Sequence, residues 1–158
     1  MQAGLNPLWH EQGCKPRDEV LKGTLTDAEL ALSLSAVGWG RAKPPYNNPV
    51  TFFQSTHLTS NMKTILENVL GRLSKAKSDV NPIIVLDVGF GGGKTHTLVT
   101  IFYAAKYPEE ANKHLAKLPH PAGVRVVAVS GDEYGSEKVQ RRNQTIRTLW
   151  GDVFWLVS

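Results

Sequence analysis

A glycine-rich run near the middle of the chain carries the residues best suited to chemistry. The run Gly89–Gly93 leads directly into the pair Lys94-Thr95. Glycines let backbone N–H groups close around phosphate oxygens, lysine can neutralise β- and γ-phosphate charge, and a threonine hydroxyl can hold Mg²⁺. We therefore predict a P-loop that binds ATP with Mg²⁺, with Thr95 as the metal contact. The candidate cofactor-binding residues are Gly89, Gly91, Gly92, Gly93, Lys94, Thr95 and His96.

The loop departs in one place from the usual spacing Gly-x-x-x-x-Gly-Lys-Thr. Counting back from Gly93 puts Val88 where the first glycine should be, and Gly89 follows one place later. Either Val88 is tolerated there, or the loop begins at Gly89 and is one residue shorter. We expect the His96 side chain, one residue into the helix, to point away from the phosphates. The alternative interpretation is a glycine-rich turn from strand to helix with no ligand.

The elements around the loop are predicted to be a strand before it and a helix after it. Pro82–Val88 is a short apolar run rich in branched residues, which is typical of a buried parallel strand. Leu98, Ile101 and Phe102 mark a helix that starts near Lys94. Val124–Val129 indicates a second strand. The expected fold class is α/β, a three-layer, AAA+-like P-loop NTPase core that is incomplete, because a doubly wound sheet needs more strands.

The rest of the chain is predicted to be mostly helical. Residues 1–78 are expected to form a helical N-terminal region and connector, and residues 79–158 the first part of a P-loop NTPase domain truncated at its C-terminus. Because the apolar pattern still runs at Ser158, we expect a fragment whose catalytic residues lie further on. The expected segments are a helical turn at 17–21, helices at 27–37 and 62–73, an extended proline-rich connector at 41–53, a helix that begins at Pro108, and a helix over 146–157.

Two further groups could take part in nucleotide chemistry, although a structural role is favoured for both. Asp132-Glu133 follows the second predicted strand and could orient Mg²⁺ and activate water, but Ser130-Gly131 intervenes, which favours a polar turn. The connector aromatics could stack on an adenine, but such side chains more often pin a connector to the core. These aromatics are Tyr46, Phe52 and Phe53.

Charged and metal-binding residues elsewhere give weaker signals. A basic cluster could contact DNA or a γ-phosphate, although a solvated helix face is favoured. The cluster consists of Lys138, Arg141, Arg142 and Arg147. His10 and Cys14 have a spacing compatible with metal binding, but no second pair completes a site.

Composition narrows the class of protein. The chain has 158 residues, a net charge of +4 and a single cysteine, which fits a reducing cytoplasm and excludes a disulfide framework. Because no long apolar stretch or leader pattern is present, we expect neither a membrane span nor a signal peptide. The mild positive charge permits contact with nucleic acid without arguing for it.

Several segments beyond the loop resemble one family. They are Cys14–Leu21, Tyr46–Pro49 with Phe52-Phe53, Thr56–Thr59, Asp87–Leu98 and Arg147–Gly151. Together they resemble the large predicted AAA+-like P-loop ATPases of domain-of-unknown-function family 499, often encoded in anti-phage defence gene clusters near DNA methyltransferases. The resemblance covers the chain from about Cys14 onward. It implies ATP contact at Gly91–Thr95 and supplies no Walker B or arginine-finger residue here.

The expected function is ATP binding as the N-terminal part of an AAA+-like ATPase that acts against foreign DNA. DNA or a DNA-modifying protein is the expected partner, and the full-length protein is expected to form a homo-oligomer. Whether this chain is itself an enzyme stays open, because its catalytic residues are unknown. A small-molecule or nucleotide kinase is one alternative, but it would need an acceptor pocket and lid. A fragment that binds nucleotide or DNA without hydrolysis is the other.

Overall fold

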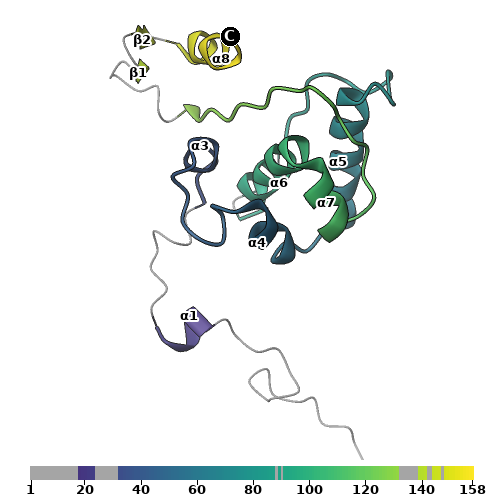
Figure 1. Cartoon of the computed structure of the whole chain (residues 1–158), viewed down its shortest axis with the longest axis vertical. Coiled ribbons are helices and arrows are strands. Elements are labelled where there is room, and N and C mark those ends of the chain that lie inside the picture. The colour runs from purple at the N-terminus through teal and green to yellow at the C-terminus, as the bar shows by residue number, and fades with distance from the viewer. Residues whose placement is uncertain are drawn as a thin grey trace, which may run out of the picture. The chain divides into compact units, whose positions relative to one another are not determined.

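The structure, a computed structural model, describes most of the chain (Figure 1). The described residues are 18–23, 32–87, 89, 91–131, 139–141, 144–146 and 148–158. The chain divides into two compact units, residues 1–31 and 32–158. The first unit contains helix α1 (Asp18–Leu21), which confirms the predicted helical turn. The predicted domain boundary between residues 78 and 79 falls inside the second unit.

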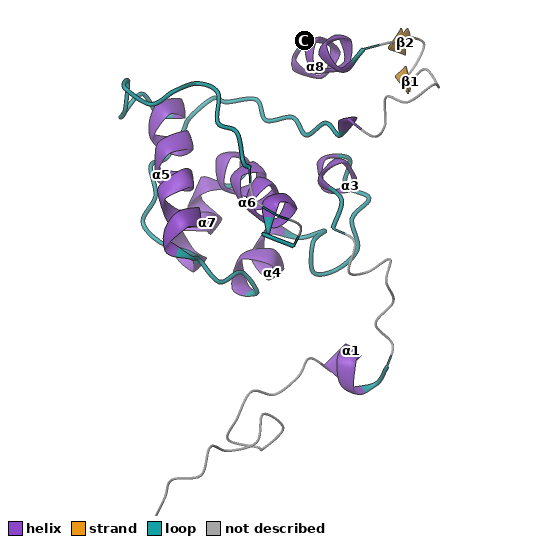
Figure 2. Cartoon of the chain, turned by 180° about the vertical axis from the view of Figure 1, so that it is seen from behind, coloured by secondary structure: helices purple, strands orange, loops and turns teal. Residues whose placement is uncertain are grey.

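Helices are the main regular elements in the described part of the second unit (Figure 2). They are α3 (Leu34–Gly38), α4 (Pro49–Gln54), α5 (Ser60–Leu73), α6 (Lys94–Lys106), α7 (Pro108–His114) and α8 (Leu149–Val157). Among the described residues the sheet structure is one antiparallel pair, β1 (Val139–Arg141) and β2 (Gln144–Ile146). In its register Val139 faces Ile146 and Arg141 faces Gln144.

The predicted three-layer α/β core is therefore wrong. Neither predicted strand forms: the described residues of 82–88 and all of 124–129 lie in loops, and Figure 2 draws the described residues between α5 and α6 as loop. Ile83 is 74% exposed and Val85 is 79% exposed, so this run is not a buried strand. An apolar run becomes a strand only where a neighbouring strand accepts its backbone hydrogen bonds, and the described residues supply none to these segments.

Helix α4 replaces part of the extended connector that was predicted for residues 41–53. The Asn48 side chain accepts hydrogen bonds from the backbone N–H of Val50 and Thr51, at 2.8 and 3.4 Å. Pro49 then occupies the first helical position, where its missing N–H costs nothing. The correction has a local cause, because an N-cap followed by proline starts a helix rather than an extended segment.

The other helices begin at residues that the sequence marks. Thr59 caps α5 by accepting from the N–H of Met62 at 3.3 Å, and α5 confirms the helix predicted at 62–73. Helices starting at Lys94 and Pro108 are likewise confirmed. The final helix is shorter than predicted and begins after Thr148, which caps it, while Ile146 lies in β2. Of the helix predicted at 27–37, the structure shows α3, and residues 27–31 lie outside the described part.

The core lies where α4, α5, α6 and α7 meet. Phe52 and Phe53 of α4 are 0% and 1% exposed, and Leu66 and Leu70 of α5 are fully buried in the same hydrophobic cluster. Helix α6 contributes five further buried side chains to this core, Val99, Phe102, Tyr103, Ala104 and Ala105. Burial of such side chains is the main favourable term in folding, so this packing fixes α6 relative to α4 and α5.

Two contacts attach loops to this helical body. The Tyr103 hydroxyl of α6 donates to the carbonyl of Tyr46 at 2.5 Å, which holds the turn before α4. Ala128 packs so closely on α3 that a Cβ at Gly38 would lie 2.8 Å from the Ala128 Cβ. Among the described residues, no helix has both the length and the apolar character needed to cross a bilayer.

Candidate functional site

The glycine loop has a backbone conformation that requires glycine. Gly91 has φ +77° and Gly93 has φ +74°, both in the left-handed region that disfavours residues with a Cβ. The N–H of Gly92 donates to the carbonyl of Gly89 at 3.1 Å and closes a tight turn. The glycines predicted from sequence thus form one compact turn directly before α6.

Three glycines of the loop have room for a Cβ. A Cβ built at Gly89, Gly91 or Gly93 meets no other heavy atom within 4 Å. At Gly91 and Gly93 glycine is therefore needed for the backbone conformation and not to relieve crowding. An anion could approach the backbone here at close range, which side chains at these positions would hinder.

The N-terminus of α6 faces this loop without a side-chain cap. Gly93 is the N-cap residue, and because it has no side chain it forms no capping hydrogen bond. Its carbonyl accepts from the N–H of Thr97 at 2.9 Å, so the helical ladder starts properly. The first turn contains no acidic residue. A helix N-terminus of this kind presents N–H groups and the positive end of the helix dipole, which favour a bound anion.

Lys94 folds back over the loop. Its Nζ donates a hydrogen bond to the carbonyl of Gly89 at 3.1 Å, and the side chain is exposed. This arrangement holds an ammonium group beside the left-handed glycines. Thr95 follows as the second helical residue and is half-buried. Both residues therefore lie in the first turn of α6, as the sequence predicts.

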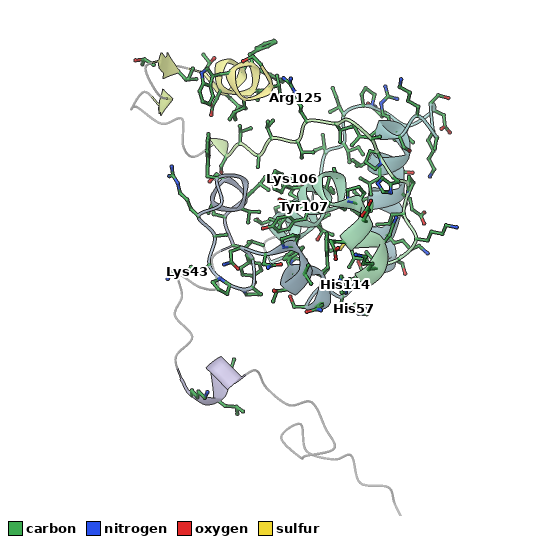
Figure 3. The ribbon with its side chains drawn as sticks, viewed as in Figure 1. Lys43, His57, Lys106, Tyr107, His114 and Arg125 are labelled. Carbon is green, nitrogen blue, oxygen red and sulfur yellow. The ribbon has the colours of Figure 1, made fainter. Side chains whose placement is uncertain are left out.

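The other lysine of α6 has a different environment. Lys106 lies at the C-terminal end, and its Nζ is 5.4 Å from the Phe102 ring centre and 5.6 Å from the Tyr107 ring centre. Figure 3 shows Lys106 next to Tyr107. This ammonium group stabilises the helix end through the dipole and the aromatic faces. Of the two lysines of α6, therefore, Lys94 lies at the glycine loop and Lys106 at the opposite end of the helix.

The His96 side chain contacts two other residues of the protein. Its Nε2 lies 3.3 Å from Thr56 Oγ1, and its ring packs on Phe52 with the ring centres 4.9 Å apart. Burial lowers the pKa of His96 below its usual value, which favours the neutral imidazole. The sequence prediction did not find the Thr56 contact, because the two residues are 40 positions apart. Any contact of His96 with a cofactor would thus come from its backbone.

The connector aromatics pack into the core. Phe52 and Phe53 are buried, and both rings contact Tyr103, at 5.4 and 6.3 Å between centres. Tyr46 lies half-buried 6.1 Å from Phe52. The structural role favoured above fits this packing, and the two phenylalanine faces are not accessible to an adenine ring.

Most of the remaining candidate residues lie outside the part of the chain that the structure describes. His10, Cys14, Asp132, Glu133, Lys138, Arg142 and Arg147 lie outside the described residues, as do Val88 and Phe90 of the loop region. Arg141 lies in β1. Within the described ranges, no three His, Cys, Asp or Glu side chains come together as a metal site.

Comparison with known proteins places the chain in a family. Residues 10–155 match the family model described as the DUF499 N-terminal domain. Because the match spans nearly the whole chain, the protein belongs to the DUF499 family. No curated protein and no solved structure matches it.

Proposed function

We propose that the chain binds ATP with Mg²⁺ at the glycine loop and the first turn of α6. One observation carries the proposal. The Lys94 ammonium group donates a hydrogen bond to the carbonyl of Gly89, in a loop with two left-handed glycines that leads into a helix N-terminus without a side-chain cap. This combination of donors suits the β- and γ-phosphates, which carry most of the negative charge of the nucleotide.

Each residue has a distinct role in the proposed site. Lys94 exchanges its bond to the Gly89 carbonyl for a phosphate oxygen, and Gly91–Gly93 supply backbone donors. The Thr95 hydroxyl holds Mg²⁺, which keeps most of its water ligands. The preference for a triphosphate follows from two sources of positive charge, the ammonium group and the helix dipole, acting on one anion.

The wider role is inferred from the family resemblance. We propose that the nucleotide site serves an AAA+-like ATPase in the cytoplasm, in defence against foreign DNA. DNA or a DNA-modifying protein is the proposed partner, and the full-length protein is proposed to form homo-oligomers. The loop geometry supports only the phosphate-binding part of this proposal.

The Lys94→Ala variant tests the site. A charge-assisted hydrogen bond is worth about 1.5–3 kcal/mol, so ATP should bind roughly 10- to 150-fold more weakly. Lys117→Ala is the matched control, because Lys117 is exposed in the loop after α7. Isothermal titration calorimetry with ATP and Mg²⁺ measures both variants beside the parent. Equal affinity of Lys94→Ala and the parent would contradict the proposal.

A nucleotide series separates phosphate recognition from base recognition. The parent should bind ATP and ADP and should bind AMP far more weakly, because the proposed donors face the β- and γ-phosphates. Thr95→Val should remove the gain in affinity that Mg²⁺ gives. Binding of AMP or adenosine as tight as that of ATP would assign the affinity to a different surface.

A further inference from the structure

A side-chain contact joins the first turn of α6 to a segment that is distant in the sequence. Thr56 lies at the junction between α4 and α5, and its Oγ1 is 3.3 Å from Nε2 of His96. His96 is the third residue of α6, two positions after Lys94. The contact therefore joins the α4–α5 junction to the helical turn that follows the glycine loop.

The hydrogen-bond directions at this contact follow from the hydroxyl geometry. Thr56 Oγ1 donates to the carbonyl of Phe52 at 2.7 Å, and a hydroxyl has one proton to give. Its oxygen must then accept from His96, so Nε2 carries the imidazole proton. The chain Nε2–H to Oγ1 to the Phe52 carbonyl fixes both the tautomer and the orientation of the ring.

The face of the His96 ring also packs against an aromatic side chain. The His96 ring lies 4.9 Å from that of Phe52, with 39° between the planes. Phe52 is fully buried and is itself fixed by Tyr103, with ring centres 5.4 Å apart. A side chain held by a hydrogen bond and by a buried ring fixes the rotation of its helical turn, and so the direction in which the first N–H groups point.

Gly93, the N-cap residue of α6, has no side chain that could hold this turn in place. Gly93 forms no capping bond, and glycine has the largest backbone freedom of any residue. We propose that Thr56 and His96 are positioning residues for the phosphate site, which hold the first turn of α6 in the orientation that receives a triphosphate without touching it. This inference rests on the proposed function, since it concerns the same loop.

Paired variants of both residues test the positioning role. Thr56→Val keeps the shape but loses the hydroxyl, and Thr56→Ser keeps the hydroxyl as a matched control. His96→Gln keeps a nitrogen donor at the distance of Nε2, and His96→Asn is too short to reach Thr56. Because one hydrogen bond is lost, Thr56→Val and His96→Asn should bind ATP with Mg²⁺ about fivefold more weakly than their controls.

A double variant and thermal unfolding distinguish positioning from simple stability. Thr56→Val combined with His96→Asn should weaken binding no more than either change alone, because both remove one interaction. Affinity is measured well below the melting temperature of each variant. If all four single variants bind like the parent while only their melting temperatures fall, the contact is structural and the inference is overturned. Should Thr56→Val not fold, equal affinity of His96→Gln and His96→Asn overturns it.

The outcome for Lys94→Ala separates this inference from the proposed function. If the parent binds ATP, Lys94→Ala does not, and the Thr56 and His96 variants match the parent, only the positioning role fails. If the parent itself does not bind ATP, the proposed function fails and the positioning role fails with it. Weaker binding in Thr56→Val with recovery in Thr56→Ser supports both.

Discussion

Replacing Gly93 by alanine probes the conformation on which the phosphate loop depends. Gly93 has φ +74° and ψ +18°, and a Cβ there meets nothing within 4 Å. The cost is therefore backbone strain alone, about 1–2 kcal/mol for an alanine in the left-handed region. Alanine also reduces the freedom of the unfolded chain, which offsets about 0.4–1 kcal/mol. The net loss of stability should be about 1 kcal/mol.

The matched control for this change is Gly131→Ala. Gly131 also has open space around the position of a Cβ, but its φ lies outside the left-handed region. Both variants change the unfolded chain alike, so the difference between them isolates the strain, about 1–2 kcal/mol. Urea unfolding followed by circular dichroism gives both free energies of unfolding. Equal stability of the two variants would refute the assigned loop conformation.

Three further predictions concern the core, the histidine and turnover. Phe52→Ala should lower the free energy of unfolding by about 3–5 kcal/mol because its ring is fully buried. The control Phe154→Ala changes a side chain that is 70% exposed and should alter the free energy of unfolding by about 0.5 kcal/mol or less. Equal losses for the two variants in urea unfolding would contradict the place of Phe52 in the core. Burial lowers the pKa of His96, so the unfolded chain takes up the proton first and stability should fall as the pH drops below the usual histidine value of about 6.5. Urea unfolding of His96→Phe should lack this component, and an unchanged pH dependence would refute it. The purified chain should show little steady-state ATP hydrolysis in a phosphate-release assay, because Ser130-Gly131 separates the acids at 132–133 from the apolar run before them; robust turnover abolished by Glu133→Gln would overturn this.

The helices were predictable where the signal is local. Thr59 before α5 and Pro108 at the start of α7 act on the turn that they begin, so sequence alone identifies them. Helix α4 carried the same kind of signal in Asn48-Pro49, which was outweighed by the density of prolines around it. The error lay in treating a proline-rich run as extended when one proline stood at a helical N-terminus.

The strands were not predictable because a strand is defined by its neighbours. The run around Ile83 to Val85 has the branched apolar residues of a buried strand, yet these residues are exposed loop here. A helix satisfies the hydrogen bonds of its own backbone, whereas a strand depends on partner strands that are often far away in sequence. Composition alone cannot supply that information.

The candidate site divides in the same way. The glycines and Lys94 are contiguous, and the structure keeps them together at one helix end. The support from Thr56 comes from 40 residues away and depends on how α4 packs against α6, so no spacing rule indicates it. Sequence reasoning thus identified the groups proposed to face phosphate and missed those proposed to position them.

A crystal structure of the chain with a non-hydrolysable ATP analogue and Mg²⁺ would show directly whether the glycine loop binds phosphate. We expect the β-phosphate against the backbone N–H groups of Gly91–Gly93, with Lys94 Nζ moved from the Gly89 carbonyl to a phosphate oxygen. A loop that stays empty while the analogue binds elsewhere, or that is shaped so that no anion can enter, would contradict it.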